Sequence, residues 1–123
     1  MSGILVVDDD VTSLAIIEET LRSEGYAVHA YESAVEASEH FEPAAYDLIL
    51  SDFFMSGMNG DEFLKTVRRR DSETPFVFLT ANTDIQLAID LVKTGADDHI
   101  TKPIVPEVLL FRIEKNLRDK QNE

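Results

Sequence analysis

Short apolar runs alternate with amphipathic stretches five times along the chain, and this alternation constrains the fold more than any other feature. The runs at residues 4–7 and 76–79 are unbroken and rich in β-branched or aromatic side chains, as in strands that are covered on both faces. Between such runs, apolar residues recur at helical spacing, for example at Val11, Leu14, Ile17 and Leu21. Strands that alternate with helices form right-handed βαβ units, so the sequence predicts an α/β fold with a doubly wound parallel sheet.

The limits of the expected helices are marked by glycines, prolines and one capping box. In that box, the Ser33 hydroxyl and the Glu36 carboxylate can each accept a hydrogen bond from a free amide of the first helical turn. The expected strands cover residues 4–7, 26–31, 48–50, 76–79 and 99–100. Five helices are expected. The first ends at Gly25, the second lies between Ser33 and Pro43, and the third begins at Gly60. The fourth carries Ile85, Ala88, Leu91 and Val92 and ends at Gly95, and the fifth begins at Pro106 with Leu110, Ile113 and Leu117 facing inward.

The composition excludes several functions. Acidic residues number 24 against 11 Lys and Arg, and the resulting net charge of −13 disfavours binding of nucleic acid or anionic lipid by this domain. The chain has no cysteine, which excludes disulfides, thiolate zinc sites and thiol catalysis. The longest apolar runs have four residues, against the ~20 of a membrane span. We expect one cytoplasmic domain over residues 1–117, and a polar tail or the start of a linker over 118–123.

Polar residues follow four of the five expected strands. Asp8 and Asp9 come after the first strand, Asp52 after the third, Thr80 after the fourth and Lys102 after the fifth. Ligands of doubly wound sheets gather at the carboxyl ends of the strands, so these side chains are expected to lie together. Crowded carboxylates without histidine or cysteine suit Mg²⁺, while an ammonium and a hydroxyl suit phosphate oxygens. The pattern indicates magnesium-dependent phosphoryl chemistry on an aspartate.

The same residues carry a family resemblance that covers nearly the whole chain. The spacing between the motifs matches as well as the motifs themselves, and the sequence resembles the receiver domains of two-component response regulators. This resemblance implies a flavodoxin-like sheet of strand order 2-1-3-4-5 with five helices. The motifs are Ile4-Leu5-Val6-Val7-Asp8-Asp9, Leu50-Ser51-Asp52, Met58-Asn59-Gly60, Leu79-Thr80-Ala81 and Thr101-Lys102-Pro103.

The resemblance assigns a role to each residue at the strand ends. Asp52 would accept a phosphoryl group from a histidine kinase or phosphotransfer protein. Mg²⁺ would be held by Asp9, Asp52 and the backbone carbonyl of Phe54, with Asp8 acting through water. The protein would then be a phosphorylated signalling switch, and would act as an enzyme only in its own phosphorylation and dephosphorylation.

The resemblance also names the residues that respond to the phosphoryl group. Thr80, Ala81 and Lys102 would contact it, His99 would stand at the switch position, and Pro103 is a candidate for a cis peptide bond. The surface of the fourth helix, fifth strand and fifth helix would change for a downstream effector or output domain. Phosphorylated copies would associate through that surface.

Three residues depart from the family pattern. Ser56 stands where receivers usually carry proline, so the loop after Asp52 is expected to be less rigid. Phe54 is bulkier than the polar residues often found two places after the phosphoacceptor, and we expect it to shield the acyl phosphate from water. His99 replaces the usual tyrosine or phenylalanine, and an imidazole can titrate near neutrality.

Two other functions fit part of the sequence. Asp8-Asp9-Asp10-Val11-Thr12 is similar to the opening motif of haloacid-dehalogenase-type phosphatases, in which Asp8 would be the nucleophile and Asp10 the general acid. That function leaves Asp52 without a role, and Asp10 also suits the position of a helix cap. The other alternative is a pseudo-receiver, a binding module that keeps the pocket without being phosphorylated.

Overall fold

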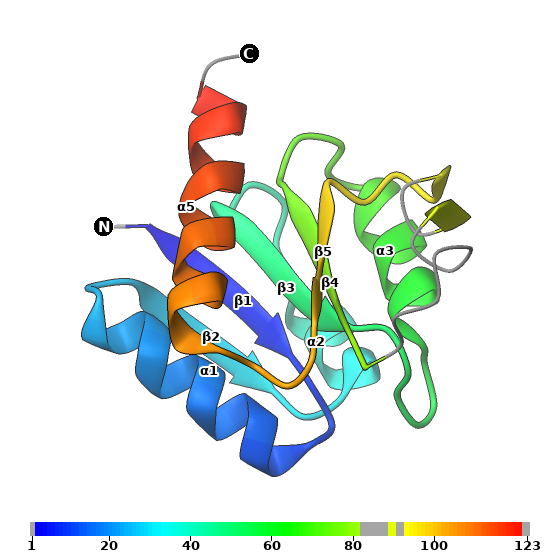
Figure 1. Ribbon diagram of the computed structural model, residues 1–123. Helices are drawn as coiled ribbons and strands as arrows, with labels where there is room; N and C mark the ends of the chain where they lie inside the picture. The colour runs from blue at the N-terminus through cyan, green and yellow to red at the C-terminus, as the bar shows by residue number, and fades with distance from the viewer. Residues whose placement is uncertain (1, 82–88, 91–92, 122–123) are drawn as a thin grey trace.

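The computed structural model describes residues 2–81, 89–90 and 93–121. Its five strands form one parallel sheet in the order β2-β1-β3-β4-β5, which confirms the expected fold class and strand order (Figure 1). Each strand is four or five residues long and coincides with one of the expected apolar runs. The strands are β1 (Gly3–Val7), β2 (Ala27–Tyr31), β3 (Leu48–Asp52), β4 (Phe76–Thr80) and β5 (Asp98–Thr101).

Four helices are described, and each begins or ends where a local signal placed its limit. The Asp10 side chain caps the first by accepting a hydrogen bond from the Thr12 amide, and Ser33 caps the second by accepting one from the Glu36 amide. The fourth expected helix, around residues 85–92, lies largely outside the described residues. The described helices are α1 (Val11–Ser23), α2 (Ala34–His40), α3 (Gly60–Arg68) and α5 (Pro106–Gln121).

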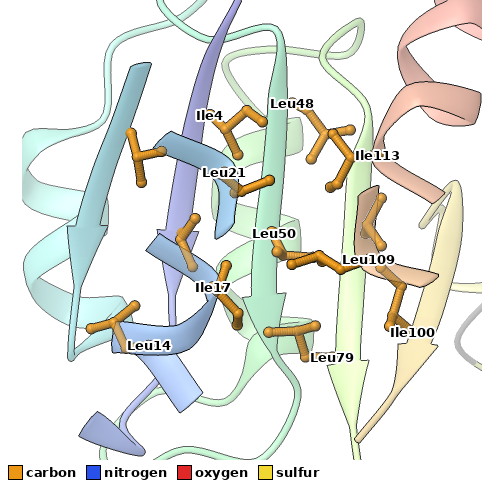
Figure 2. Packing of buried hydrophobic residues seen from close by; sticks show 13 residues of the cluster. Ile4, Leu14, Ile17, Leu21, Leu48, Leu50, Leu79, Ile100, Leu109 and Ile113 are labelled. Atoms are coloured by element: carbon orange, nitrogen blue, oxygen red, sulfur yellow. The ribbon is translucent and has the colours of Figure 1, made fainter. Parts of the chain in front are cut away.

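One face of the sheet is covered by α1 and α5 (Figure 1). Figure 2 shows how Leu14, Ile17 and Leu21 of α1 pack on the even-numbered residues of β1 and β3, such as Ile4 and Leu50. Successive side chains of a strand point to opposite faces, so the odd-numbered residues of β1 must pack elsewhere. They contact α2 and α3 on the other face, in a second cluster that contains Leu5, Val7, Ile49, Phe63, Leu64, Val67, Phe76 and Phe78.

Three apolar positions differ from the expectation for the helices. Val11 belongs to the apolar spacing of α1, yet it is the first residue of the helix and is 61% exposed. In α5 the fully buried residues are Leu109 and Ile113, whereas Leu110 and Leu117 pack at the margin of the cluster. The buried face of α5 continues from Leu109 and Ile113 to Asn116. Because Asn116 is polar, the apolar pattern in the sequence did not identify this face.

The last turn of α5 runs through residues 118–121, the segment expected to be a tail or the start of a linker. Lys120 in this turn forms an ion pair with Glu73, whose Oε2 lies 2.5 Å from the Nζ atom. The helix therefore remains attached to the domain along its length. No helix among the described residues is long and apolar enough to cross a membrane.

Candidate functional site

Three charged side chains from different strands meet at the carboxyl edge of the sheet. Asp8 follows β1, Asp52 ends β3, and Lys102 follows β5. The Nζ atom of Lys102 lies 2.9 Å from Oδ2 of Asp8 and 3.2 Å from Oδ2 of Asp52. The parallel sheet brings them together. The strands β1 and β3 are neighbours, and Thr101, the residue before Lys102, pairs with Thr80 at the end of β4.

Asp8 is fully buried, and its two carboxylate oxygens have different surroundings. Oδ1 accepts a hydrogen bond from the Asp10 amide at 2.9 Å. Oδ2 lies 2.9 Å from the Lys102 ammonium, which is its ion-pair partner. A carboxylate oxygen can accept more than one partner, so this buried atom can also serve a bound cation.

Asp9 completes a cluster of three carboxylates. One oxygen each from Asp8, Asp9 and Asp52 lies within 4.8 Å of the others. The side chain of Asp9 is exposed, whereas the other two are buried, so the cluster has one side open to solvent. Oxygen-only donors and an open side both fit Mg²⁺, which retains several waters in protein sites.

The site changes the acidity of its own groups. Burial, and then the negative charge of Asp8, raise the pKa of Asp52 to about 6, although Lys102 works against both effects. Burial lowers the pKa of Lys102, but the carboxylates of Asp8 and Asp52 more than offset it and raise the pKa above the ordinary value for lysine. Lys102 is therefore fully charged at neutral pH and balances part of the acidic charge.

The residues expected to contact phosphate lie on β4 and β5. Thr80 ends β4 and is buried, and its carbonyl oxygen accepts a hydrogen bond from the Lys102 amide at 2.7 Å. Ala81 follows it and is exposed. His99 is half-buried on β5, opposite Phe78 of β4, and the peptide bond between Lys102 and Pro103 is cis.

The loop after Asp52 is packed against the start of α3. The Gly60 amide donates a hydrogen bond to the Phe53 carbonyl at 2.7 Å, so the helix begins directly beside the end of β3. The ring of Phe53 contacts the ring of Phe54 edge to face, with centroids 4.8 Å apart, and contacts Phe78 at 5.4 Å. Phe54 itself is 56% exposed and lies two residues from the Asp52 carboxylate.

The same loop also reaches the first strand. The Ser56 amide donates a hydrogen bond to Oδ2 of Asp9 at 3.2 Å. This contact was not predicted, because the two residues are 47 positions apart and the donor is a main-chain group. The departure from proline at position 56 was the one available signal, since proline has no amide hydrogen to donate.

Comparison with known proteins assigns the chain to a family. A family model described as the response regulator receiver domain matches residues 4–114. The chain belongs to this family. This match confirms the predicted resemblance. Receiver domains are signalling domains.

Several relatives share both the sequence and the fold. The chain is 34% identical to the phosphoglycerate transport system transcriptional regulatory protein PgtA of Salmonella typhimurium, over 98% of this chain and 29% of that protein. It is 37% identical to the DNA-binding response regulator MtrA of Mycobacterium tuberculosis, over 98% of this chain and 52% of that protein. The chain thus spans about half or less of the length of these curated relatives.

Solved receiver structures match over almost the whole chain. The chemotaxis response regulator CheY4 of Vibrio cholerae superposes with a TM-score of 0.88 at 32% identity, covering 94% of this chain and 98% of that one. The non-phosphorylated HemR receiver domain from Leptospira biflexa also gives a TM-score of 0.88, at 28% identity, covering 95% of this chain and 94% of that one.

The surroundings of Asp10 do not favour the phosphatase alternative. Asp10, its expected general acid, instead accepts hydrogen bonds from the Thr12 amide and the Ser13 hydroxyl at the start of α1. The hydrogen bond from Ser13 is the largest effect on the pKa of Asp10 and lowers it. A carboxyl group with a lowered pKa is poorly suited to donate a proton near neutral pH.

Proposed function

We propose that this receiver domain accepts a phosphoryl group on Asp52 from a phosphohistidine, in a reaction that depends on Mg²⁺. The observation that carries the proposal is the contact of Lys102 with both Asp8 and Asp52 at an edge where a third carboxylate, Asp9, lies within reach. This combination provides a nucleophile, a fixed positive charge and a set of oxygen ligands for a divalent cation.

Each residue has a defined part in the transfer. A carboxylate oxygen of Asp52 attacks phosphorus, the P–N bond of the phosphohistidine breaks, and its electron pair remains on the imidazole nitrogen. Lys102, already 3.2 Å from Asp52, neutralises charge on the transferred group. Bound Mg²⁺ would be held by Asp8, Asp9, Asp52 and the Phe54 carbonyl, and would supply further neutralisation of the phosphoryl oxygens.

The signal would arise in β4 and β5, the two strands that follow β3 in the order of the sheet. Thr80 is buried at the end of β4, the strand that lies next to β3 and Asp52. A new dianion biases the arrangement of Thr80, Ala81 and Lys102, and His99 lies on β5 in the path from the site to α5. The surface formed by the fourth helix, β5 and α5 would then be read by an effector or output domain, or by a second copy.

The chemical test uses a small acyl-phosphate donor with and without Mg²⁺. We expect labelling of Asp52 that requires the metal, located by mass spectrometry, and loss of that label in Asp52→Asn. An Asp8→Asn variant should be labelled more slowly. Labelling of Asp8 with release of phosphate would contradict the proposal and support the phosphatase, whereas Mg²⁺ binding without any label would support the pseudo-receiver.

The biological test uses the protein's own partners. We expect a histidine kinase or phosphotransfer protein to phosphorylate the wild-type chain, and Asp52→Asn to remain unmodified under the same conditions. Transfer that proceeds equally well to Asp52→Asn would place the acceptor elsewhere and overturn the assignment.

A further inference from the structure

The hydrogen bond between Ser56 and Asp9 is specific to a receiver that lacks proline in this loop. The donor is the Ser56 amide and the acceptor is Oδ2 of Asp9, 3.2 Å away. A proline at position 56 has no amide hydrogen, so the usual family residue could not make this contact. Any residue other than proline could make it, because the side chain of Ser56 is not involved.

The loop around Ser56 is held in place from both sides. The side chain of Met55 is buried, and its amide donates a hydrogen bond to Oδ1 of Asn59 at 3.2 Å. Gly57 has a φ of 82°, a left-handed conformation that glycine adopts without strain. The Met58 amide then bonds back to the Ser56 carbonyl at 3.1 Å. With its neighbours fixed in this way, the Ser56 amide is directed at Asp9 rather than at solvent.

The position of the Asp9 side chain depends on this one contact, whereas Asp8 and Asp52 are held in other ways. Asp8 is fixed by burial, by the Asp10 amide and by Lys102, and Asp52 is fixed by Lys102. Asp9 is exposed, and among the residues that the structure describes the Ser56 amide is the sole hydrogen-bond donor to its carboxylate. An exposed side chain without this donor would sample several rotamers.

We infer that the Ser56 amide is a positioning donor for Asp9, which holds this carboxylate within the cluster for Mg²⁺. The inference rests on the proposed use of the cluster as a metal site. It gives the absence of proline a physical role: the metal ligand after β1 and the loop after β3 are joined by a main-chain hydrogen bond. Occupation of the site is thereby coupled to the conformation of residues 53–59.

The first experiment measures binding of Mg²⁺ alone by isothermal titration calorimetry. Ser56→Pro removes the donor, and Ser56→Ala is the matched control that keeps it. We expect Ser56→Pro to weaken Mg²⁺ binding by about three- to tenfold, the contribution of one exposed hydrogen bond to a carboxylate. Ser56→Ala should bind like the wild type. Equal affinities of the two variants, both folded by circular dichroism, would overturn the inference.

A second measurement does not require the proline variant to fold. Amide hydrogen exchange at Ser56 should be slowed in the wild type and should accelerate in Asp9→Ala, because the acceptor is gone. The Met55 amide, which bonds to Asn59, is the internal control and should exchange at the same rate in both proteins. An exchange rate at Ser56 that does not change in Asp9→Ala would also overturn the inference.

The two proposals fail in different ways. Wild-type protein that is labelled on Asp52, but whose Mg²⁺ affinity is the same in Ser56→Pro and Ser56→Ala, rejects the role of Ser56 and retains the phosphoacceptor. Wild-type protein that is never labelled, but whose Mg²⁺ affinity falls only in Ser56→Pro, retains the role of Ser56 and rejects the phosphoacceptor.

Discussion

At the scale of single residues, the site separates charge neutralisation from protection against water. Lys102 contacts both buried carboxylates and balances part of their negative charge. Phe54 follows Asp52 by two residues, and its ring contacts Phe53 edge to face and is largely exposed. A ring in this position can exclude water from a group on Asp52 without contributing to its binding.

Phe54→Asn is therefore expected to shorten the lifetime of the phosphorylated domain. Loss of the ring admits water to the acyl phosphate, and a change of about two- to tenfold in the hydrolysis rate corresponds to at most ~1.4 kcal/mol in the barrier. The measurement is the decay of labelled Asp52 after removal of the donor. Phe54→Leu is the control that keeps an apolar side chain, and its phosphorylated lifetime should lie between those of the wild type and Phe54→Asn. An unchanged or longer lifetime in Phe54→Asn would show that the ring does not shield the site.

At the scale of elements, the start of α3 fixes the end of β3. A methyl group at Gly60 would collide with the Asp52 carbonyl oxygen and would lie 2.9 Å from the Phe53 Cα and from Cε1 of Phe78. Two of these three atoms belong to the backbone of Asp52 and Phe53 and cannot move away easily. The helix and the strand approach each other this closely only because residue 60 has no side chain.

Gly60→Ala should consequently lower the free energy of unfolding by about 1–3 kcal/mol, the usual cost of overpacking. Urea denaturation followed by circular dichroism measures the change. The matched control is Gly3→Ala, where the added methyl group would lie 3.9 Å from the nearest atom, the Ala45 carbonyl oxygen, and stability should change little. Equal stabilities of the two variants would mean that α3 adjusts without cost.

At the scale of the whole molecule, the edge of the sheet opposite the site is held by hydrogen bonds to Asp71. This buried carboxylate lies between α3 and β4. It accepts hydrogen bonds from the Ala44 amide at 2.9 Å, from the amides of Glu73 and Thr74 at 3.0 Å, and from the Thr74 hydroxyl at 2.7 Å. The loop before β3 and the loop before β4 are thus joined at one side chain. Burial acts to raise the pKa of Asp71, but these hydrogen bonds hold it well below its ordinary value.

A carboxyl group whose pKa is lower in the folded than in the unfolded protein stabilises the fold when it is ionised. Asp71→Asn should therefore reduce the free energy of unfolding by about 1–3 kcal/mol near neutral pH. The difference from the wild type should shrink as the pH falls below about 4, where the carboxyl group of the unfolded chain becomes protonated. Urea denaturation at several pH values measures it. Glu42→Gln removes an exposed carboxylate nearby and should have little effect; a pH-independent effect of Asp71→Asn would contradict the argument.

Much of the fold follows from local patterns. The unbroken run at residues 4–7 predicted a strand covered on both faces, and the two clusters on either side of β1 confirm this. The position of Asp52 at the edge of the sheet also followed from sequence, because the carboxyl ends of parallel strands gather there. Asp8, Asp52 and Lys102 were predicted to meet on this basis, and they do.

Local patterns were enough to predict the strands, the helix limits that glycine, proline and capping residues mark, and the residue types at the strand ends, because each of these depends on neighbours in the chain. Three other features are visible only in the folded molecule: Leu109 rather than Leu110 faces the sheet, Gly60 has no room for a side chain, and the Ser56 amide reaches Asp9. These features depend on distances between segments far apart in the chain. Such distances are set only when the helices pack on the sheet.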